Sequence, residues 1–164
     1  MPITKQNGMQ RLNDALTKDG SSKSSLNGNS RFDSLMSQVK GSTITKDRLR
    51  DEIFNILLDD AVESPSEGKW YMFEYDPKFK DRLVEWDQYP LIFYLEGKGS
   101  NVIGANMHYI SSNARLSAIN RKKFPKSSLR QYIPKNADSI FFEIQESEVQ
   151  LLSLLPLEKF HHKN

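Results

Sequence analysis

KWYMFEYDPKFKDRLVEWDQYPLIFYLEGKGSNVIGANMHYI, residues 69–110, decides the fold of this chain and holds both tryptophans and five of the six tyrosines. Two apolar runs, residues 90–96 and 102–110, flank the turn sequence GKGSN, which predicts a β-hairpin. Nearly every position of the first run is apolar, so we expect that strand to be covered on both faces. Gly104 interrupts the second run and predicts a bulge or a close approach of another backbone segment.

The segments around this hairpin predict more strands and a helix. Residues 70–75 are rich in aromatic side chains, residues 139–145 read SIFFEIQ, and residues 148–155 form another apolar run that we interpret as a last strand. A helix with Asn113 as its cap is expected to end at Pro125. About five strands with one packed helix predict an α+β fold, either a small β-barrel or a curved antiparallel sheet.

A helix is expected to precede this β domain. Thr45 is a suitable N-cap, and Asp47 places negative charge in the first turn. The apolar stripe of this helix comprises Leu49, Ile53, Ile56, Leu57 and Ala61. Residues 45–68 therefore form a helix and a linker.

Residues 1–44 resemble an extended arm with two short amphipathic segments separated by a serine-rich linker. Helices this short are marginal in water unless they pack on another surface. Two interpretations follow, a disordered tail with accidental periodicity or a partner-binding arm that becomes ordered on neighbouring subunits. The apolar residues of that arm are Met9, Leu12, Leu16, Phe32, Leu35, Met36 and Val39. The complete division is an arm (1–44), a helix and linker (45–68), a β domain (69–160) and a tail (161–164) with exposed histidines.

Composition excludes several kinds of protein. The absence of cysteine removes disulfides, thiolate catalysis and cysteine-ligated zinc, and fits a reducing compartment. No apolar run approaches the roughly 20 residues that span a bilayer, and no signal-peptide core follows Met1, so no membrane partner is expected.

Charge is unevenly distributed although the net charge is only +2. Residues 47–89 carry 12 acidic and 6 basic side chains, whereas residues 111–136 carry seven basic side chains and no acidic one. The predicted basic surface comprises Arg115, Arg121, Lys122, Lys123, Lys126 and Arg130. Such a surface fits an acidic face of a neighbouring protein, which is the first interpretation, or the phosphates of a nucleic acid, which is the alternative.

Candidate catalytic and metal-binding residues are sparse. His108 has no second histidine at metal-ligand spacing and is expected to be a core or rim residue. Glu74, Asp76, Glu85 and Asp87 are interpreted as scattered surface acids. A hydrolase or nuclease using Glu74, Asp76 and His108 is a third interpretation, but the sequence predicts no enzyme, no catalytic residues, no metal and no cofactor.

Four motifs resemble those of virion structural proteins from contractile-tailed bacteriophages. They are YDPK at Tyr75–Lys78, WDQYPLI at Trp86–Ile92, GANMHYI at Gly104–Ile110, and LPLEKF at Leu155–Phe160. The resemblance covers residues 70–160 and not the arm. The stretch after Ile110 is shorter and more basic than the family pattern.

The resemblance implies a structural subunit of a virion, in the tail or baseplate, assembled in the host cytoplasm and without catalysis. Its expected partners are other virion proteins, including copies of itself, held through the arm and the β domain. The alternative is a nucleic-acid-binding virion or genome-end protein that uses the basic 115–135 region.

Overall fold

The computed structural model describes residues 30–77, 80–133 and 140–162 of the 164-residue chain. Its helices are α3 (Asp33–Lys40), α4 (Lys46–Leu57), α5 (Ser112–Arg121) and α6 (Glu146–Leu154). Its strands are β1 (Ala61–Val62), β2 (Trp70–Met72), β3 (Glu85–Asp87), β4 (Leu91–Lys98), β5 (Asn101–Asn106), β6 (Leu129–Tyr132), β7 (Phe141–Ile144) and β8 (Phe160–His162). Short 3₁₀ helices are η1 (Leu58–Asp60), η2 (Lys80–Arg82), η3 (Met107–Tyr109) and η4 (Lys126–Ser128).

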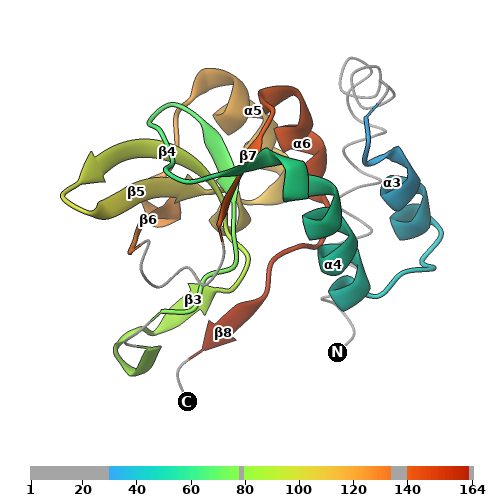
Figure 1. Ribbon diagram of the computed structural model, residues 1–164, viewed down its shortest axis with the longest axis horizontal. Coiled ribbons are helices and arrows are strands. Elements are labelled where there is room, and N and C mark those ends of the chain that lie inside the picture. The colour runs from blue at the N-terminus through green and yellow to red at the C-terminus, as the bar shows by residue number, and fades with distance from the viewer. Residues whose placement is uncertain (1–29, 78–79, 134–139, 163–164) are drawn as a thin grey trace.

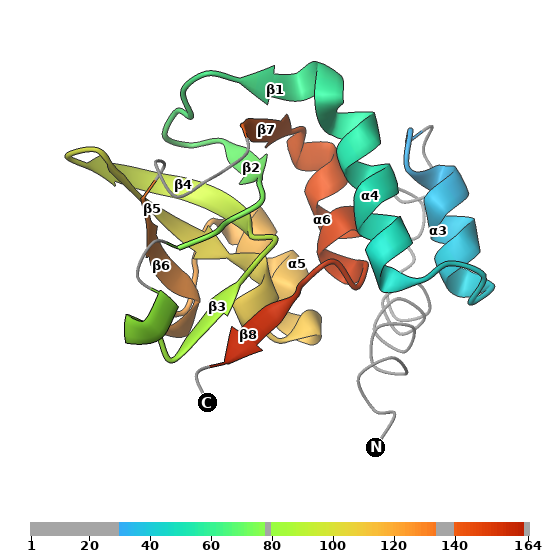
Figure 2. The same cartoon turned by 60° about the horizontal axis from the view of Figure 1, so that its bottom comes forward.

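A curved antiparallel sheet is the centre of the fold, as the sequence predicted, but it does not close into a barrel. Its strand order is β1-β7-β2-β4-β5-β6, and β3 and β8 pair separately as a two-stranded ribbon. The register of β4 on β5 shifts between Tyr94 and Glu96, and such a bulge increases local twist. Helices α3, α4 and α6 lie together on one side of the sheet in Figures 1 and 2.

Both faces of the central strands are buried, each in its own apolar cluster. Successive side chains along a strand point to opposite faces and so enter different clusters. On β2, Trp70 and Met72 face the helices, while Tyr71 points into a second apolar cluster on the opposite face. That second cluster consists of Tyr71, Phe73, Tyr75, Ile92, Tyr94, Val102, Tyr132 and Phe141. The prediction that the 90–96 strand is covered on both faces is confirmed.

The apolar face of α3 is buried in its own chain, whereas the sequence predicted that neighbouring subunits would cover it. Phe32, Leu35, Met36 and Val39 are all at least nine-tenths buried and pack in the same cluster as α4 and α6. The periodicity of apolar residues identified the buried face of α3. It could not show that α4 and α6 of the same chain pack against that face. Met9, Leu12 and Leu16 lie outside the described residues.

The C-terminal segment differs from the prediction in two ways. Residues expected to form a last strand instead form α6, with Glu146 and Glu148 in its first turn. Its short apolar run is buried at Val149 and Leu152, and such a run does not distinguish a strand from a buried helix. His161, expected in a frayed tail, lies in β8 opposite Trp86 of β3.

Gly104 allows β5 to approach β4 closely, as its position in the sequence predicted. A Cβ atom at this position would lie 2.8 Å from Ile92 Cδ1 and 3.3 Å from the carbonyl oxygen of Phe93. Gly104→Ala is therefore expected to lower the free energy of unfolding by about 1–3 kcal/mol in urea titration. Gly41→Ala is the control, since its nearest neighbour would lie at 3.5 Å. Equal stability of the two variants would contradict this account of the sheet.

Candidate nucleic-acid interface

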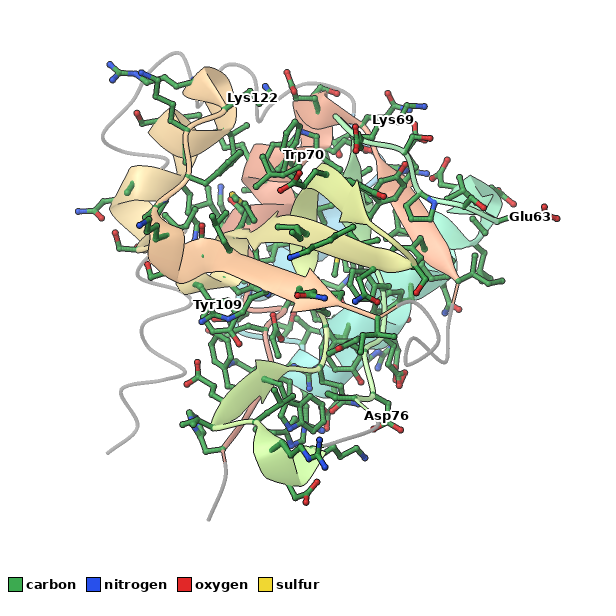
Figure 3. All side chains as sticks on the ribbon, turned by 90° about the vertical axis from the view of Figure 1, so that its left-hand side faces the viewer. Glu63, Lys69, Trp70, Asp76, Tyr109 and Lys122 are labelled. Carbon is green, nitrogen blue, oxygen red and sulfur yellow. The ribbon has the colours of Figure 1, made fainter. Side chains whose placement is uncertain are left out.

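Five basic side chains follow one another from the end of α5 to the start of β6. Arg121 ends α5, Lys122 and Lys123 follow it, Lys126 opens η4, and Arg130 lies on β6. We call these five residues the basic strip. All are exposed except Arg130, which is half-buried. In Figure 3, Lys122 lies at the opposite end of α5 from Tyr109.

Arg115 is not part of this strip, which corrects the prediction for that residue. Its side chain is buried, and its guanidinium donates to the carbonyl oxygens of Ile110, at 2.8 Å, and Ser153. Ser153 lies in the last turn of α6, where carbonyl groups lack helical partners and the helix dipole is negative. Arg115 therefore joins α5 to the C-terminal end of α6 instead of facing solvent.

Lys122 is held in place by groups of its own chain. Its backbone is left-handed (φ 56°) and ends α5, while its ammonium group donates to the carbonyl oxygen of Ile119 at 2.9 Å. The ammonium also lies 2.6 Å from Glu146 Oε1, which in turn accepts a hydrogen bond from the Trp70 indole at 3.3 Å. The bond from Lys122 is the main reason that the pKa of Glu146 is lowered. Part of the charge of Lys122 is thus neutralised.

Arg130 forms the other end of the strip and stacks on Tyr109, which lies outside it. The Arg130 guanidinium carbon lies 4.0 Å from the centre of the Tyr109 ring, and its Nη1 donates to the carbonyl oxygens of Ser127 and Leu129. Burial, followed by the negative charges of Asp87 and Glu85, raises the pKa of Tyr109 to about 12. Tyr109 therefore stays neutral at physiological pH and supports a fixed cation above its ring.

The remaining cations of the strip, Arg121, Lys123 and Lys126, form no ion pair with another residue of the described ranges. One group of acidic side chains lies on α4, beside Lys46, Arg48 and Arg50 of the same helix, and on the segment after it, and α6 separates α4 from α5 in Figures 1 and 2. These acidic residues are Asp47, Asp51, Glu52, Asp59 and Glu63. A polyanion would therefore meet unpaired positive charge at the end of α5 and in η4, and repulsion at residues 58–68, which carry four acidic side chains and no basic one.

Asp87 is buried and is not the surface acid that the sequence suggested. Its carboxylate lies 2.7 Å from His108 Nδ1 and accepts bonds from the Asn106 amide (3.0 Å) and from the backbone N–H groups of Tyr89 and Lys159 (3.1 Å each). The four donors come from different segments, so one carboxylate joins the ribbon to β5 and η3. The expectation that His108 lies in the core or at its rim is confirmed, since its side chain has no exposed area.

The hydrolase interpretation receives no geometric support from these contacts. His108 bonds to Asp87 inside the protein, while Asp76 forms an ion pair with Lys80 at 2.5 Å. His108 Nε2 is buried without a hydrogen-bond partner in the described part of the chain, where no solvent-borne substrate reaches it. In those same ranges, no group of three or more acidic or histidine side chains is arranged to hold a metal ion.

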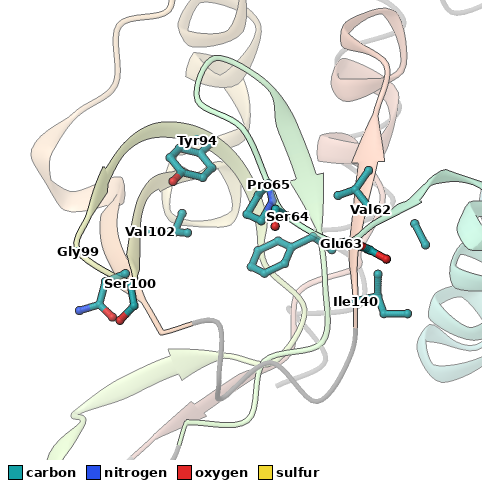
Figure 4. Close-up of a pocket in the computed structure, with 12 residues that line it drawn as sticks. Val62, Glu63, Ser64, Pro65, Tyr94, Gly99, Ser100, Val102 and Ile140 are labelled. Carbon is teal, nitrogen blue, oxygen red and sulfur yellow. The ribbon is translucent and has the colours of Figure 1, made fainter.

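A groove of about 460 Å³ lies at the open end of the second apolar cluster. It lies between the hairpin tip at Gly99 and Ser100 and the segment from Val62 to Pro65, as Figure 4 shows. The one charged side chain among its lining residues is Glu63, an acid. This groove consequently offers no cation to a phosphate, unlike the basic strip.

Comparison of the sequence with known protein families gives a match. Residues 6–125 match the family described as phage T4 terminal DNA protecting protein. The chain belongs to this bacteriophage family. Among curated proteins and among solved structures, no significant match was found.

Membership of the terminal DNA protecting family confirms the phage origin that the sequence motifs suggested, but it does not show the expected place in the tail or baseplate. The family description names terminal DNA and not a tail or baseplate. The matched residues include all of α5 and the strip up to Lys123, whereas Lys126 and Arg130 follow the match. No helix in the described ranges is long and apolar enough to cross a bilayer.

Proposed function

We propose that this member of the terminal DNA protecting family binds the ends of linear duplex DNA in the phage virion, with the basic strip against the phosphate backbone. The observation that carries the proposal is the exposed positive charge at the end of α5 and in η4. It occurs in a member of a family whose description names the protection of terminal DNA. The alternative of a genome-end protein is thereby favoured over a tail subunit.

The chemistry of the strip suits phosphate better than base edges. Lysine and arginine contacts to phosphates release counterions and carry no sequence information, so the expected binding is independent of sequence. Arg121, Lys123 and Lys126 are exposed and supply charge. Arg130 is less mobile, because it is stacked on Tyr109 and bonded to backbone carbonyl groups. It offers a guanidinium group in a fixed orientation.

We infer that protection is passive, with the bound protein covering the DNA end and no bond being made or broken. The buried position of the Asp87–His108 pair supports this inference, since neither side chain has exposed area. The acidic segment after α4, residues 58–68, is proposed to face away from the DNA, which would set one orientation of the protein on a duplex end.

A titration of linear duplex DNA over a range of salt concentrations tests the proposal. The logarithm of the association constant is expected to fall with the logarithm of salt concentration with a slope between about −3 and −5, as for three to five phosphate contacts. A covalently closed duplex of the same sequence should bind more weakly. Binding that is absent, or that ignores salt, would contradict the proposal.

Glu146→Gln is expected to change DNA binding and stability in opposite directions. Loss of the carboxylate releases Lys122 and should increase duplex affinity about fivefold, with a slope steeper by about 1. The pKa of Glu146 is lowered in the folded protein, so its stabilising effect is present above the ordinary value of 4.5 and is lost as the pH falls through the folded pKa. Because the carboxylate is largely exposed, the stability lost at neutral pH is expected to be below about 1 kcal/mol. Unchanged affinity would show that Lys122 does not face the DNA.

A further inference from the structure

The β3–β8 ribbon lies apart from the main sheet and presents one face outward. Glu85, Trp86 and Asp87 pair with His162, His161 and Phe160, respectively. In Figures 1 and 2 the ribbon lies near the C-terminal end of the chain, away from α3 and α4. Asp87 fixes the position of the ribbon. Its carboxylate accepts hydrogen bonds from the Asn106 amide, at the end of β5, and from the backbone N–H of Lys159, just before β8.

Alternation along the strands gives the ribbon an inner and an outer face. Asp87 and Phe160 share the inner face, where Asp87 is buried and the Phe160 ring lies 5.2 Å from the Tyr109 ring. Trp86 and His161 share the outer face. Tyr109 supports Arg130, so the ribbon continues directly from the end of the basic strip.

The outer face carries a stacked pair of flat rings. The Trp86 and His161 rings are nearly parallel, 14° apart, with centroids separated by 4.1 Å, and both residues are half-buried. A contact of 2.8 Å between His161 Nε2 and Gln88 Oε1 fixes the plane of the imidazole ring. Val84, two residues before Trp86, is 80% exposed. An ordered aromatic stack on this face is thus preceded in sequence by an apolar side chain that is largely exposed in the described ranges.

Two lysines lie near this stack, together with the acidic side chains of Asp76 and Glu85. The Lys80 ammonium lies 5.7 Å from the centre of the Trp86 ring while it pairs with Asp76, and Lys159 directly precedes β8, two residues before His161. Burial, then Lys159 and Lys80, lowers the pKa of His161, so the imidazole is neutral at physiological pH. A neutral ring stack flanked by lysines suits a nucleobase with its phosphate.

We propose that the outer face of the β3–β8 ribbon binds the unpaired terminal bases of a single-stranded DNA tail, which stack against the Trp86–His161 pair while Lys80 and Lys159 contact the phosphates. This inference rests on the proposed function and names the form of DNA end that the protein prefers. The basic strip holds the duplex backbone, and the ribbon receives the strand that leaves the duplex. Val84, exposed just before β3, is proposed to contact the same bases.

Three DNAs and the full-length protein test the inference by fluorescence anisotropy. The first is a hairpin with one blunt end, the second the same hairpin with a tail of about five thymidines, and the third a dumbbell without ends. The tail is expected to increase affinity about tenfold over the blunt hairpin, as stacking of one or two bases provides. Only the tailed DNA should quench the emission of Trp86, one of two tryptophans in the chain.

Variants of the outer face should remove the preference for the tail without altering affinity for the dumbbell. Trp86→Leu and Val84→Ser are the two test variants, and the high exposure of Val84 makes the second safe for folding. Leu58→Ser is the matched control, because Leu58 is also an exposed apolar residue, at 61%, but lies in η1. It should keep the tenfold preference.

The outcomes separate this inference from the proposed function. Equal binding of tailed and blunt hairpins, or a tail preference that survives both Trp86→Leu and Val84→Ser, overturns the ribbon inference while the strip retains its proposed role. Trp86 emission that responds to another virion protein and not to DNA overturns it as well, by assigning the ribbon to a protein contact. Failure of the chain to bind any of the three DNAs overturns both proposals.

Discussion

Replacement of Arg121, Lys123 and Lys126 by glutamine is expected to weaken binding to linear duplex DNA about 100-fold at physiological salt. Each lost phosphate contact removes about 0.9 from the slope of log affinity against log salt, so the slope should become less negative by about 3. The three side chains are exposed, so the free energy of unfolding should change by less than about 0.5 kcal/mol each. Anisotropy titrations at several salt concentrations measure both quantities.

A second triple variant controls for net charge. Lys40, at the end of α3, and Lys46 and Arg48, on α4, change the net charge by the same amount when they are replaced by glutamine. If the strip is the contact surface, this variant should bind DNA within about threefold of the natural chain. Equal losses in the two variants would show that total charge, and not the position of α5 and η4, controls binding.

Asp87→Asn is expected to be the most destabilising conservative substitution in the chain, with a loss of about 3–5 kcal/mol. Asparagine would replace one carboxylate oxygen by an NH2 group, whose hydrogens would meet a group that already donates, either the Asn106 amide or the backbone N–H of Lys159. At this chain length, the loss corresponds to a fall in Tm of about 10 °C. Thermal unfolding and amide exchange of β3 and β8 measure the effect.

Asp81→Asn is the control for Asp87→Asn. Asp81 lies in η2, close to β3 in sequence, and is exposed, so its replacement should change stability by less than about 0.5 kcal/mol. A loss below about 1 kcal/mol for Asp87→Asn would mean that the carboxylate is not what joins the ribbon to the body.

Local sequence patterns predicted those parts of the fold in which neighbours along the chain determine the structure. The hairpin of β4 and β5 follows from its apolar runs and from Gly99, whose positive φ of 64° suits a tight turn. Thr45 caps α4 as expected, accepting a hydrogen bond from the backbone N–H of Arg48. The α+β class and the curved sheet follow from such elements.

The errors come from contacts between residues far apart in sequence. Asp87 meets Asn106 and His108, which are 19 and 21 residues away, so nothing near Asp87 distinguishes it from a surface acid. The sequence predicts an exposed Arg115 because arginine side chains are mostly exposed in proteins. In the structure, the Arg115 side chain on α5 instead donates to a carbonyl oxygen at the end of α6. The same limit applies to α3, whose apolar face gave no indication of what would cover it.

One signal for the buried polar cluster was present in the sequence. Asp87 lies inside the motif WDQYPLI, and Asn106 and His108 lie inside GANMHYI. Polar residues enclosed in apolar strands are expected to pair with one another, because an unpaired buried polar group is costly. The Trp86–His161 stack had no comparable signal, since it depends on the pairing of β3 with β8.

Protection of DNA ends from an added exonuclease tests the central claim most directly. A linear duplex incubated with the protein is digested by an enzyme that starts at ends and, separately, by an endonuclease that does not. We predict that the natural chain slows the exonuclease and leaves the endonuclease rate unchanged, and that the Arg121, Lys123 and Lys126 triple variant loses this protection. Equal inhibition of both nucleases, or protection that the triple variant retains in full, would contradict binding of DNA ends by the basic strip.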